Sequence, residues 1–260
     1  MQATKTFTVS INARLFSEAI ASVMYAVSKD ACKASLTCVY VFADKATGLI
    51  QFASTDGHRL ATYSVECSTD SFEVLIPGKE LRKINTLLKK TQKADVLQLS
   101  VGADTATFTV EGKILESVTL PELQYPEYKR LIPRESSHSL ICDRMALVNC
   151  LKESKAGCPE KDYILAQLKV NSPEQTISIS VGRGGEYHAA GSVGVKTKDD
   201  TTLIVLDRRY LLEALTAIAS KEVEIKASPG KERCPITIST FEKTKTAEAI
   251  ALIMPARIWL

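Results

Sequence analysis

Few side chains in this sequence have the types and spacing that catalysis requires. The three histidines are His58, His138 and His188, and His58 stands two residues after the acidic Asp56. Such a pair, with a cysteine nearby in space, could perform acid–base or nucleophilic chemistry, but no nucleophile motif accompanies it. We therefore expect no catalytic residue, and an enzyme centred on His58 is kept as the alternative.

Phosphate-loop and metal chemistry have equally little support. The run Gly182-Arg183-Gly184-Gly185 lacks the Lys and the Ser or Thr of a phosphate-binding loop, so a turn is expected there. The cysteines are odd in number and form no C-x-x-C pair. They are Cys32, Cys38, Cys67, Cys142, Cys150, Cys158 and Cys234. We expect reduced, mostly buried thiols, no metal and no cofactor.

A basic helix is the strongest candidate for binding. The segment 79–90 follows Pro77-Gly78, and its apolar side chains cluster on one side of a helical projection. The basic side chains fall within an arc of about 120° on the other side: Lys79, Arg82, Lys83, Lys89, Lys90 and Lys93. Such a face is commonly just solvated, and contact with nucleic-acid phosphates is the alternative.

The other expected helices carry mixed charge. Arg14 shares its polar face with Glu18, and Arg209 shares its own with Glu213. The net charge of +3 is small, so a nucleic-acid role depends on where the charges lie.

These candidates must be positioned by short strands and a few helices. Hydrophobic periodicity predicts helices over about 13–27, 79–90, 143–155 and 207–220. Strands are predicted at 7–11, 38–42, 49–54, 60–65, 72–76, 96–101, 106–110 and 114–120, then at 139–142, 163–170, 175–181, 186–193 and 202–206, with three more at the end. No stretch approaches the ~20 apolar residues of a membrane span, and the start lacks a signal peptide, so we expect a cytoplasmic protein.

The order of the predicted helices and strands repeats in the two halves of the chain. The segments 74–88 and 204–218 align with an offset of 130 residues, half of the 260-residue chain, which indicates an internal duplication. A proline-rich, charged stretch lies between the halves. We predict domains at 1–122 and 139–260, joined by a linker at 123–138.

Three short segments carry a family resemblance. They are STDGHRLA (54–61), YPEYKRLIP (125–133) and IMPARI (253–258). In this order they resemble the T-D-G-H-R-L-A turn, the F-P-D-Y-R-R-V-L/I-P linker and the V-M-P-M-R-L ending of the bacterial DNA polymerase III beta subunit, the DNA sliding clamp. The resemblance covers the second and third of that family's three domains.

The resemblance implies an α+β fold of two tandem sliding-clamp (processivity-fold) domains, each with two helices on antiparallel sheets. Clamps form six-domain rings with helices lining the hole, so a two-domain chain would close the ring most simply as a homotrimer. The DNA-contacting residues are then expected to be Arg14, Lys79, Arg82, Lys83, Lys90, Arg144 and Arg209.

In the family the three segments line one peptide-binding groove. Carried over, the groove residues are Thr55, Gly57, His58, Arg59, Leu60, Pro126, Arg130, Leu131, Met254, Pro255 and Arg257. Leu60, Leu131 and Met254 are expected to form an apolar floor, and Arg130 and Arg257 to orient polar or acidic parts of the peptide. Ala256 replaces a second methionine, and Trp259-Leu260 extend beyond the family's usual end.

The resemblance thus implies a non-catalytic processivity factor that encircles double-stranded DNA without sequence specificity. Its expected partners are DNA polymerase, clamp-loader subunits and other replication or repair proteins, each bound through a short hydrophobic peptide. One alternative is a clamp-like adaptor or decoy that binds such peptides without forming a ring. Another is a mixed ring with a three-domain clamp. This alternative is disfavoured, because two domains plus three do not make the six domains of a ring.

Overall fold

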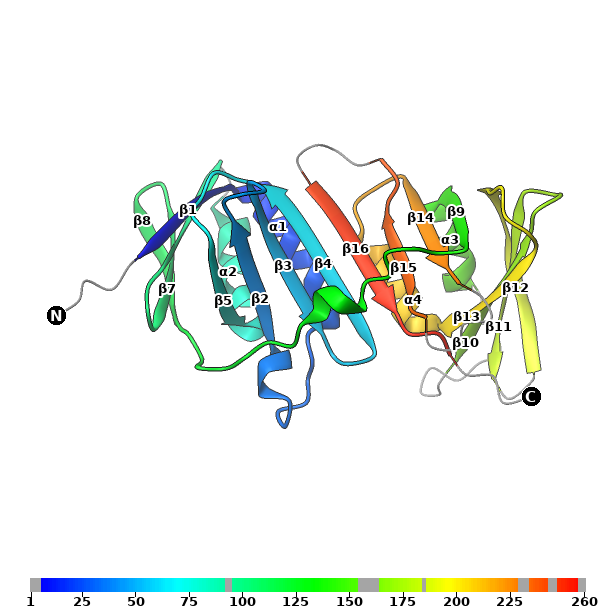
Figure 1. Ribbon diagram of the computed structural model, residues 1–260, viewed down its shortest axis with the longest axis horizontal. Coiled ribbons are helices and arrows are strands. Elements are labelled where there is room, and N and C mark those ends of the chain that lie inside the picture. Colours follow the sequence, from blue (N-terminus) through cyan, green and yellow to red (C-terminus); the bar gives the residue numbers. More distant parts are fainter. Residues whose placement is uncertain are drawn as a thin grey trace. The chain divides into compact units, whose positions relative to one another are not determined.

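The computed structural model describes residues 6–91, 95–153, 164–183, 186–228, 234–242 and 247–256. The chain divides into two compact units (Figure 1). Unit 1 comprises Met1–Pro126 with Thr244–Ala249, and unit 2 comprises Glu127–Lys243 with Ile250–Leu260. The division between Pro126 and Glu127 lies inside the segment expected to link two domains.

The described residues of unit 1 form two α-helices and two four-stranded groups of antiparallel strands. Its helices are α1 (Ala13–Val23) and α2 (Gly78–Lys90), with short 3-10 turns η1 (Met24–Ala26) and η2 (Ala34–Thr37). One sheet has the order β1-β6-β7-β8, formed by β1 (Phe7–Asn12), β6 (Val96–Val101), β7 (Thr105–Val110) and β8 (Lys113–Thr119). The other group has the order β5-β2-β3-β4, formed by β2 (Cys38–Asp44), β3 (Leu49–Thr55), β4 (Arg59–Glu66) and β5 (Phe72–Pro77).

Unit 2 repeats this arrangement. Its helices are α3 (Arg144–Glu153) and α4 (Arg208–Ala217), preceded by the 3-10 turn η3 (Tyr128–Leu131). The strands β9 (His138–Asp143), β14 (Glu222–Ala227), β15 (Ile236–Thr240) and β16 (Ala247–Ile253) pair in the order β9-β14-β15-β16. The strands β10 (Leu165–Asn171), β11 (Thr176–Arg183), β12 (Glu186–Lys196) and β13 (Thr202–Asp207) pair in the order β13-β10-β11-β12.

The two strand orders are the same when each element of unit 1 is matched to its counterpart in unit 2. The backbone contacts at the helix starts repeat as well. The amide of Ala13 donates to the carbonyl of Asp95 just before β6, and the amide of Arg144 donates to Lys221 just before β14, both at 2.9 Å. The predicted α+β class, with two helices on antiparallel sheets in each half, is confirmed.

Three of the four described helices begin at an Asn or Asp that ends a strand. The Asn12 carboxamide accepts hydrogen bonds from the amides of Arg14 and Leu15, and Asp207 does the same at the start of α4. The Asp143 carboxylate accepts from the amide of Ala146 at the start of α3. These side chains satisfy amides that have no partner within the helix, so each strand passes directly into its helix.

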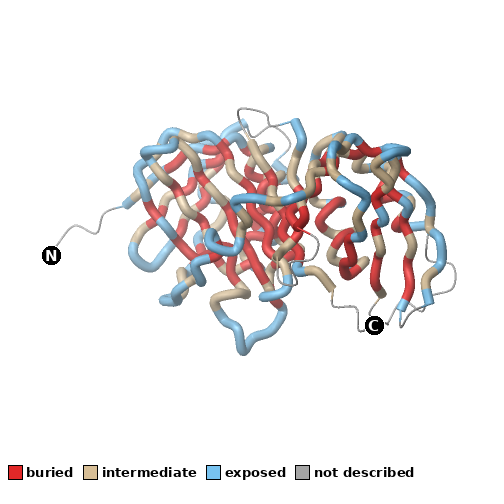
Figure 2. The backbone as a smooth tube through the Cα atoms, turned by 45° about the vertical axis from the view of Figure 1, so that its right-hand side comes forward, coloured by how far each residue is buried: buried red, intermediate tan, exposed pale blue. Residues whose placement is uncertain are grey.

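The core of unit 1 lies between its helices and both sets of strands. Phe16 of α1 packs edge-on against Phe52 of β3 at 5.8 Å between ring centroids, and it contacts Phe108 of β7 at 5.9 Å. All three rings are fully buried. In both units the buried residues follow the strands and one side of each helix, whereas exposed residues gather at the turns (Figure 2).

Candidate DNA-contacting helices and peptide-binding segments

Helix α2 has one buried face and one strongly basic face. Leu81, Ile84 and Leu88 are buried against unit 1, as the helical projection predicted. The side chains on the other face are exposed, and they are Lys79, Arg82, Lys83, Lys89 and Lys90. The helix therefore presents five cations and a single acid, Glu80, and Lys93 lies outside the described residues.

Part of this charge is neutralised locally. The Lys83 ammonium lies 2.6 Å from the Glu116 carboxylate of β8, and this hydrogen bond and charge raise the pKa of Lys83. Lys79 is 84% exposed and lies 3.7 Å from Glu80, a distance too long for a strong contact. Lys79, Arg82, Lys89 and Lys90 therefore give α2 most of its available positive charge.

Arg14 on α1 is paired within its own helix. Its guanidinium lies 2.9 Å from Glu18, although the side chain is 87% exposed. Glu18 also accepts a hydrogen bond from the Tyr63 hydroxyl at 3.2 Å. Burial and the Glu18 charge raise the pKa of Tyr63 to about 12. Arg14 and the α2 cations belong to adjacent helices of unit 1, since Ser17 of α1 donates a 2.7 Å hydrogen bond to Asn85 of α2.

Arg144, expected to contact DNA, is engaged elsewhere. Its guanidinium donates to the carbonyls of Leu215 at 3.0 Å and Ser220 at 2.6 Å, at the C-terminal end of α4. Arg208, the first residue of α4, donates in turn to the Leu151 carbonyl in the last turn of α3. Each helix of unit 2 thus begins with an arginine that caps the end of the other, where carbonyls lack helical partners and cations are favoured.

Arg209 is the exposed cation of unit 2 that was expected on the DNA face. Its guanidinium lies 5.1 Å from the centroid of the Tyr210 ring, a cation–π distance. The repeated Asp-Arg pair at 143–144 and 207–208 could have revealed the reciprocal capping in advance, because both pairs stand where a strand turns into a helix.

The segment 55–60 forms the turn between β3 and β4. The Thr55 hydroxyl donates to the Arg59 carbonyl at 2.6 Å and accepts from the Gly57 amide at 3.1 Å. Gly57 has φ +94°, a conformation that favours glycine. The His58 side chain is exposed, and its amide donates to Asp56 at 2.9 Å. The turn is therefore held in one shape by its own Thr and Asp side chains.

Several interactions tie Arg59 to unit 1. Its Nε donates to the Asp56 carboxylate at 2.9 Å, and a terminal nitrogen donates to the Tyr25 carbonyl at 2.6 Å. The guanidinium also lies 5.2 Å from the centroid of the Tyr25 ring. With only 10% of its side chain exposed, Arg59 stabilises this turn and offers little free surface.

The linker residues carried over from the family lie at the start of unit 2 and just before it. Pro126 and Arg130 are exposed, and Arg130 forms a 2.6 Å ion pair with Glu127. Leu131 is 52% exposed, whereas Leu60 is 1% exposed. Leu131 thus presents apolar surface, as a groove floor requires, and Leu60 does not.

The tail residues follow β16 in unit 2. Met254 is 40% exposed, and Pro255 is half-buried. The Ala256 amide donates to the Val205 carbonyl of β13 at 3.0 Å, so the tail runs beside that strand. Arg257, Trp259 and Leu260 lie outside the described residues.

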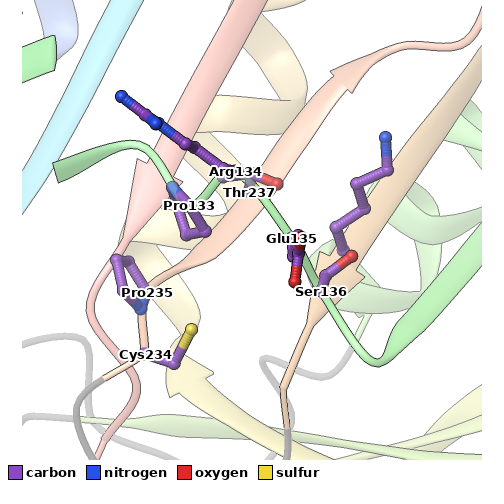
Figure 3. A pocket seen from close by; sticks show the side chains of 8 residues that line it. Pro133, Arg134, Glu135, Ser136, Cys234, Pro235 and Thr237 are labelled. Carbon is purple, nitrogen blue, oxygen red and sulfur yellow. The ribbon is translucent and has the colours of Figure 1, made fainter. Parts of the chain in front are cut away.

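A small cavity that sequence reasoning missed lies within unit 2, just after Leu131. Its volume is about 110 Å³, and it is lined by Pro133, Arg134, Glu135, Ser136, Lys226, Cys234, Pro235 and Thr237. Figure 3 shows Pro133 and Pro235 close together, with Arg134 extending away from them. The lining brings together a linker segment and two strand regions at least 90 residues away, a proximity that local patterns do not encode.

Two observations bear on metal and thiol chemistry in the described residues. Among them, no group of three His, Cys, Asp or Glu side chains is placed to hold a metal ion. Burial raises the pKa of the Cys142 thiol to about 12, so it remains protonated near neutral pH. In the same part of the chain, no helix is long and apolar enough to cross a membrane.

Comparison with known proteins agrees with this geometry. Residues 10–127 match the family model described as DNA polymerase III beta subunit, central domain. The beta sliding clamp of Synechocystis sp. is 25% identical over 256 residues, covering 93% of this chain and 63% of that protein. That of Treponema pallidum is 29% identical, covering 89% of this chain and 61% of that protein.

A solved structure shows the same fold. The crystal structure of the DNA polymerase sliding clamp from Bacillus subtilis superposes with a TM-score of 0.85 at 19% identity, covering 100% of this chain and 66% of that one. The chain thus spans less than two thirds of the length of the curated relatives above. The chain is therefore similar to the DNA polymerase III beta subunits, the beta sliding clamps, and its residues 10–127 match the model of their central domain.

Proposed function

We propose that the chain is a non-catalytic sliding clamp subunit. Copies of it would close into a ring around double-stranded DNA and hold a DNA polymerase, clamp-loader subunits and other replication or repair proteins through short hydrophobic peptides. The observation that carries the proposal is the basic face of α2, on a two-unit chain related to beta sliding clamps.

The α2 face is suited to phosphates rather than bases. Its exposed cations are mostly lysines, which act as mobile point charges and contribute attraction that depends on salt but not on sequence. Reading a sequence requires side chains that reach base edges with fixed geometry. Weak, non-specific attraction fits a ring that stays on DNA by enclosing it and still slides.

Ring closure needs strands that can pair with another copy. In the described part of unit 1, β8 pairs with β7 on one side and ends its sheet, and its Ile114 is 70% exposed. In the described part of unit 2, β12 pairs along most of its length with β11, but it pairs with β9 only through Val195 and Lys196. Edge strands of this kind are templates for pairing. We infer that β8 of one copy joins β12 of the next, head to tail.

The number of copies follows from the number of units. A head-to-tail contact closes when the rotation between copies fits, and three copies of a two-unit chain supply six units. Sedimentation equilibrium should then give about 85 kDa, three times 28.4 kDa, over a wide range of concentration. Ile114→Asp should return the mass to that of one chain. A wild-type monomer at all concentrations would refute the ring and favour a peptide-binding adaptor.

Peptide capture rests on the exposed apolar side chains of the linker and the tail. Leu131 and Met254 present apolar surface, and prolines border both segments. Met254→Glu should lower the affinity for a fluorescein-labelled hexapeptide containing leucine and phenylalanine at least about tenfold. Solution mass and DNA binding should stay unchanged, and an unchanged peptide affinity would place the site elsewhere.

A further inference from the structure

Three aromatic rings form a continuous stack on one face of unit 1. Tyr40 and Phe42 alternate along β2, so their side chains lie on the same face of the sheet. Their rings are 6.3 Å apart and 8° from parallel. Tyr125 continues the stack, with its ring 5.3 Å from Tyr40 and 7° from parallel.

The middle ring of the stack is fixed in orientation. The Tyr40 hydroxyl donates a 2.5 Å hydrogen bond to the carboxylate of Glu73 on β5. Phe42 is paired with the same Glu73 across the two strands. Tyr125 therefore rests on a rigid platform built from two neighbouring strands.

Tyr125 belongs to a stretch without helix or strand. After β8 ends at Thr119, the next regular element is η3, which begins at Tyr128. Pro126 follows Tyr125 directly and restricts the backbone of that residue to extended conformations. The stack thus fixes the place from which the chain leaves unit 1.

A second aromatic side chain fixes the chain three residues later. Tyr128 is 2% exposed, and its burial raises the pKa of its hydroxyl. Around Tyr128, the Arg130 amide donates a hydrogen bond to the Glu127 carbonyl at 3.3 Å. The side chains of Lys129, Arg130 and Leu131, which follow Tyr128, are exposed. Tyr125 and Tyr128 are therefore held in place, while Arg130 and Leu131, which are proposed to meet the peptide, lie at the surface.

We propose that Tyr125, stacked on Tyr40, is a positioning residue for peptide capture: it holds the 126–131 segment so that Arg130 and Leu131 are presented in a fixed place. This inference rests on the proposed peptide-binding function. Fixing a loop before binding removes the cost of ordering it during binding, so the stack should raise affinity without itself touching the peptide.

Trypsin cleavage after Lys129 and Arg130 reports directly on this segment. Tyr125→Ala removes a stacked ring, which should speed cleavage at these two sites at least about fivefold. Cleavage after Lys113, the exposed first residue of β8, serves as the internal reference because global unfolding would speed cleavage at all three sites. Tyr125→Phe keeps the ring and should cleave at the wild-type rate, and Tyr40→Ala should reproduce Tyr125→Ala.

Peptide affinity separates positioning from a purely structural role. With the labelled hexapeptide as probe, Tyr125→Ala and Tyr40→Ala should weaken binding about fivefold or more, and Tyr125→Phe should restore it. DNA affinity and solution mass should not change in any of these variants.

The possible outcomes separate three statements: that the stack anchors the segment, that this anchoring aids peptide capture, and that the groove binds peptides. If trypsin cleaved after Lys129 and Arg130 at the wild-type rate in both alanine variants, the stack would not anchor the segment. Faster cleavage with unchanged peptide affinity would leave a structural anchor and overturn its role in capture. A wild-type chain that binds no such peptide would refute the proposed groove, while the cleavage rates would still decide whether the stack holds the segment.

Discussion

The two units share a fold but begin their helices with different residues. In unit 2 the first residues of both helices are arginines, Arg144 and Arg208. In unit 1 the corresponding residues are Ala13 and Gly78. A Cβ atom at Gly78 would lie 3.0 Å from the Val27 side chain and 3.1 Å from the Thr37 carbonyl oxygen, so a long side chain does not fit there.

The two units also differ in what their cationic side chains contact. Arg144 and Arg208 direct their guanidinium groups at carbonyls within unit 2, whereas the α2 cations of unit 1 lie on the solvent-exposed side of their helix. The helices of unit 1 are joined instead by the neutral Ser17–Asn85 hydrogen bond. One pair of helices therefore uses arginine for its own stability, and the other keeps its cations available for a ligand.

The largest expected effect comes from neutralising the α2 face. The triple variant Lys79→Gln, Arg82→Gln and Lys90→Gln should weaken binding to duplex DNA of any sequence about 100-fold at low salt, and lower the slope of log K against log salt by about 2 to 3. Fluorescence anisotropy across a salt series measures both quantities. Lys83 is left in place because Glu116 already pairs with it.

The matched variant in unit 2 is Arg209→Gln with Lys152→Gln. It removes the exposed basic residues of α3 and α4 and spares the two capping arginines. Its effect on DNA affinity should be clearly smaller than that of the α2 variant. If the unit 2 variant weakened DNA binding as much or more, the division of roles between the units would be wrong.

Removing a capping arginine should lower stability rather than DNA affinity. Arg144→Ala leaves the Leu215 and Ser220 carbonyls without their charged donor, which should cost about 2 kcal/mol in the free energy of unfolding measured with urea. Arg208→Ala should behave alike. Arg14→Ala in unit 1 breaks only an exposed ion pair and should cost no more than about 0.5 kcal/mol.

A smaller difference should emerge at alkaline pH. Burial, with the Asp143 and Glu222 carboxylates adding to it, raises the pKa of Cys142 in unit 2 to about 12 from 9.0. Burial and Glu18 raise the pKa of Tyr63 in unit 1 to about 12 from 10.0. Both shifts favour the protonated form in the folded state. Their contribution is fully present below pH 9 to 10 and is lost as the pH rises toward 12.

The two contributions can be separated by substitution. Cys142→Ala should flatten the fall in unfolding free energy that begins near the unfolded thiol pKa, and Tyr63→Phe should flatten the part that begins about one unit higher. Urea unfolding between about pH 8 and pH 10.5 tests this. A slope unchanged by either substitution would show that other groups control the alkaline response.

Much of the fold could be predicted because its signals are local. The alternation in segments such as CVYVF and the one-sided apolar pattern of 79–90 give each strand and helix to within a few residues. The offset of 130 between 74–88 and 204–218 predicted the repeated order of elements. Periodicity reports which face of an element is buried, and burial is what the fold requires.

The site was less predictable because its details depend on pairs that are distant in sequence. Arg144 is exposed in a helical projection, yet its donors reach carbonyls more than 70 residues away. Tyr125 reads as one aromatic residue in a proline-rich linker, and its stacking partner Tyr40 lies 85 residues before it. The burial of Leu60 likewise follows from tertiary packing, which the motif T-D-G-H-R-L does not specify.

The proposed ring would enclose DNA, whereas a basic surface alone would only adhere to it. Chains assembled at high concentration with nicked circular plasmid should stay on the DNA through gel filtration in about 0.2 M salt, where phosphate contacts alone are weak. Cutting the plasmid once should release them, because a ring slides off a free end. Equal retention on circular and linear DNA, or none on either, would contradict the ring.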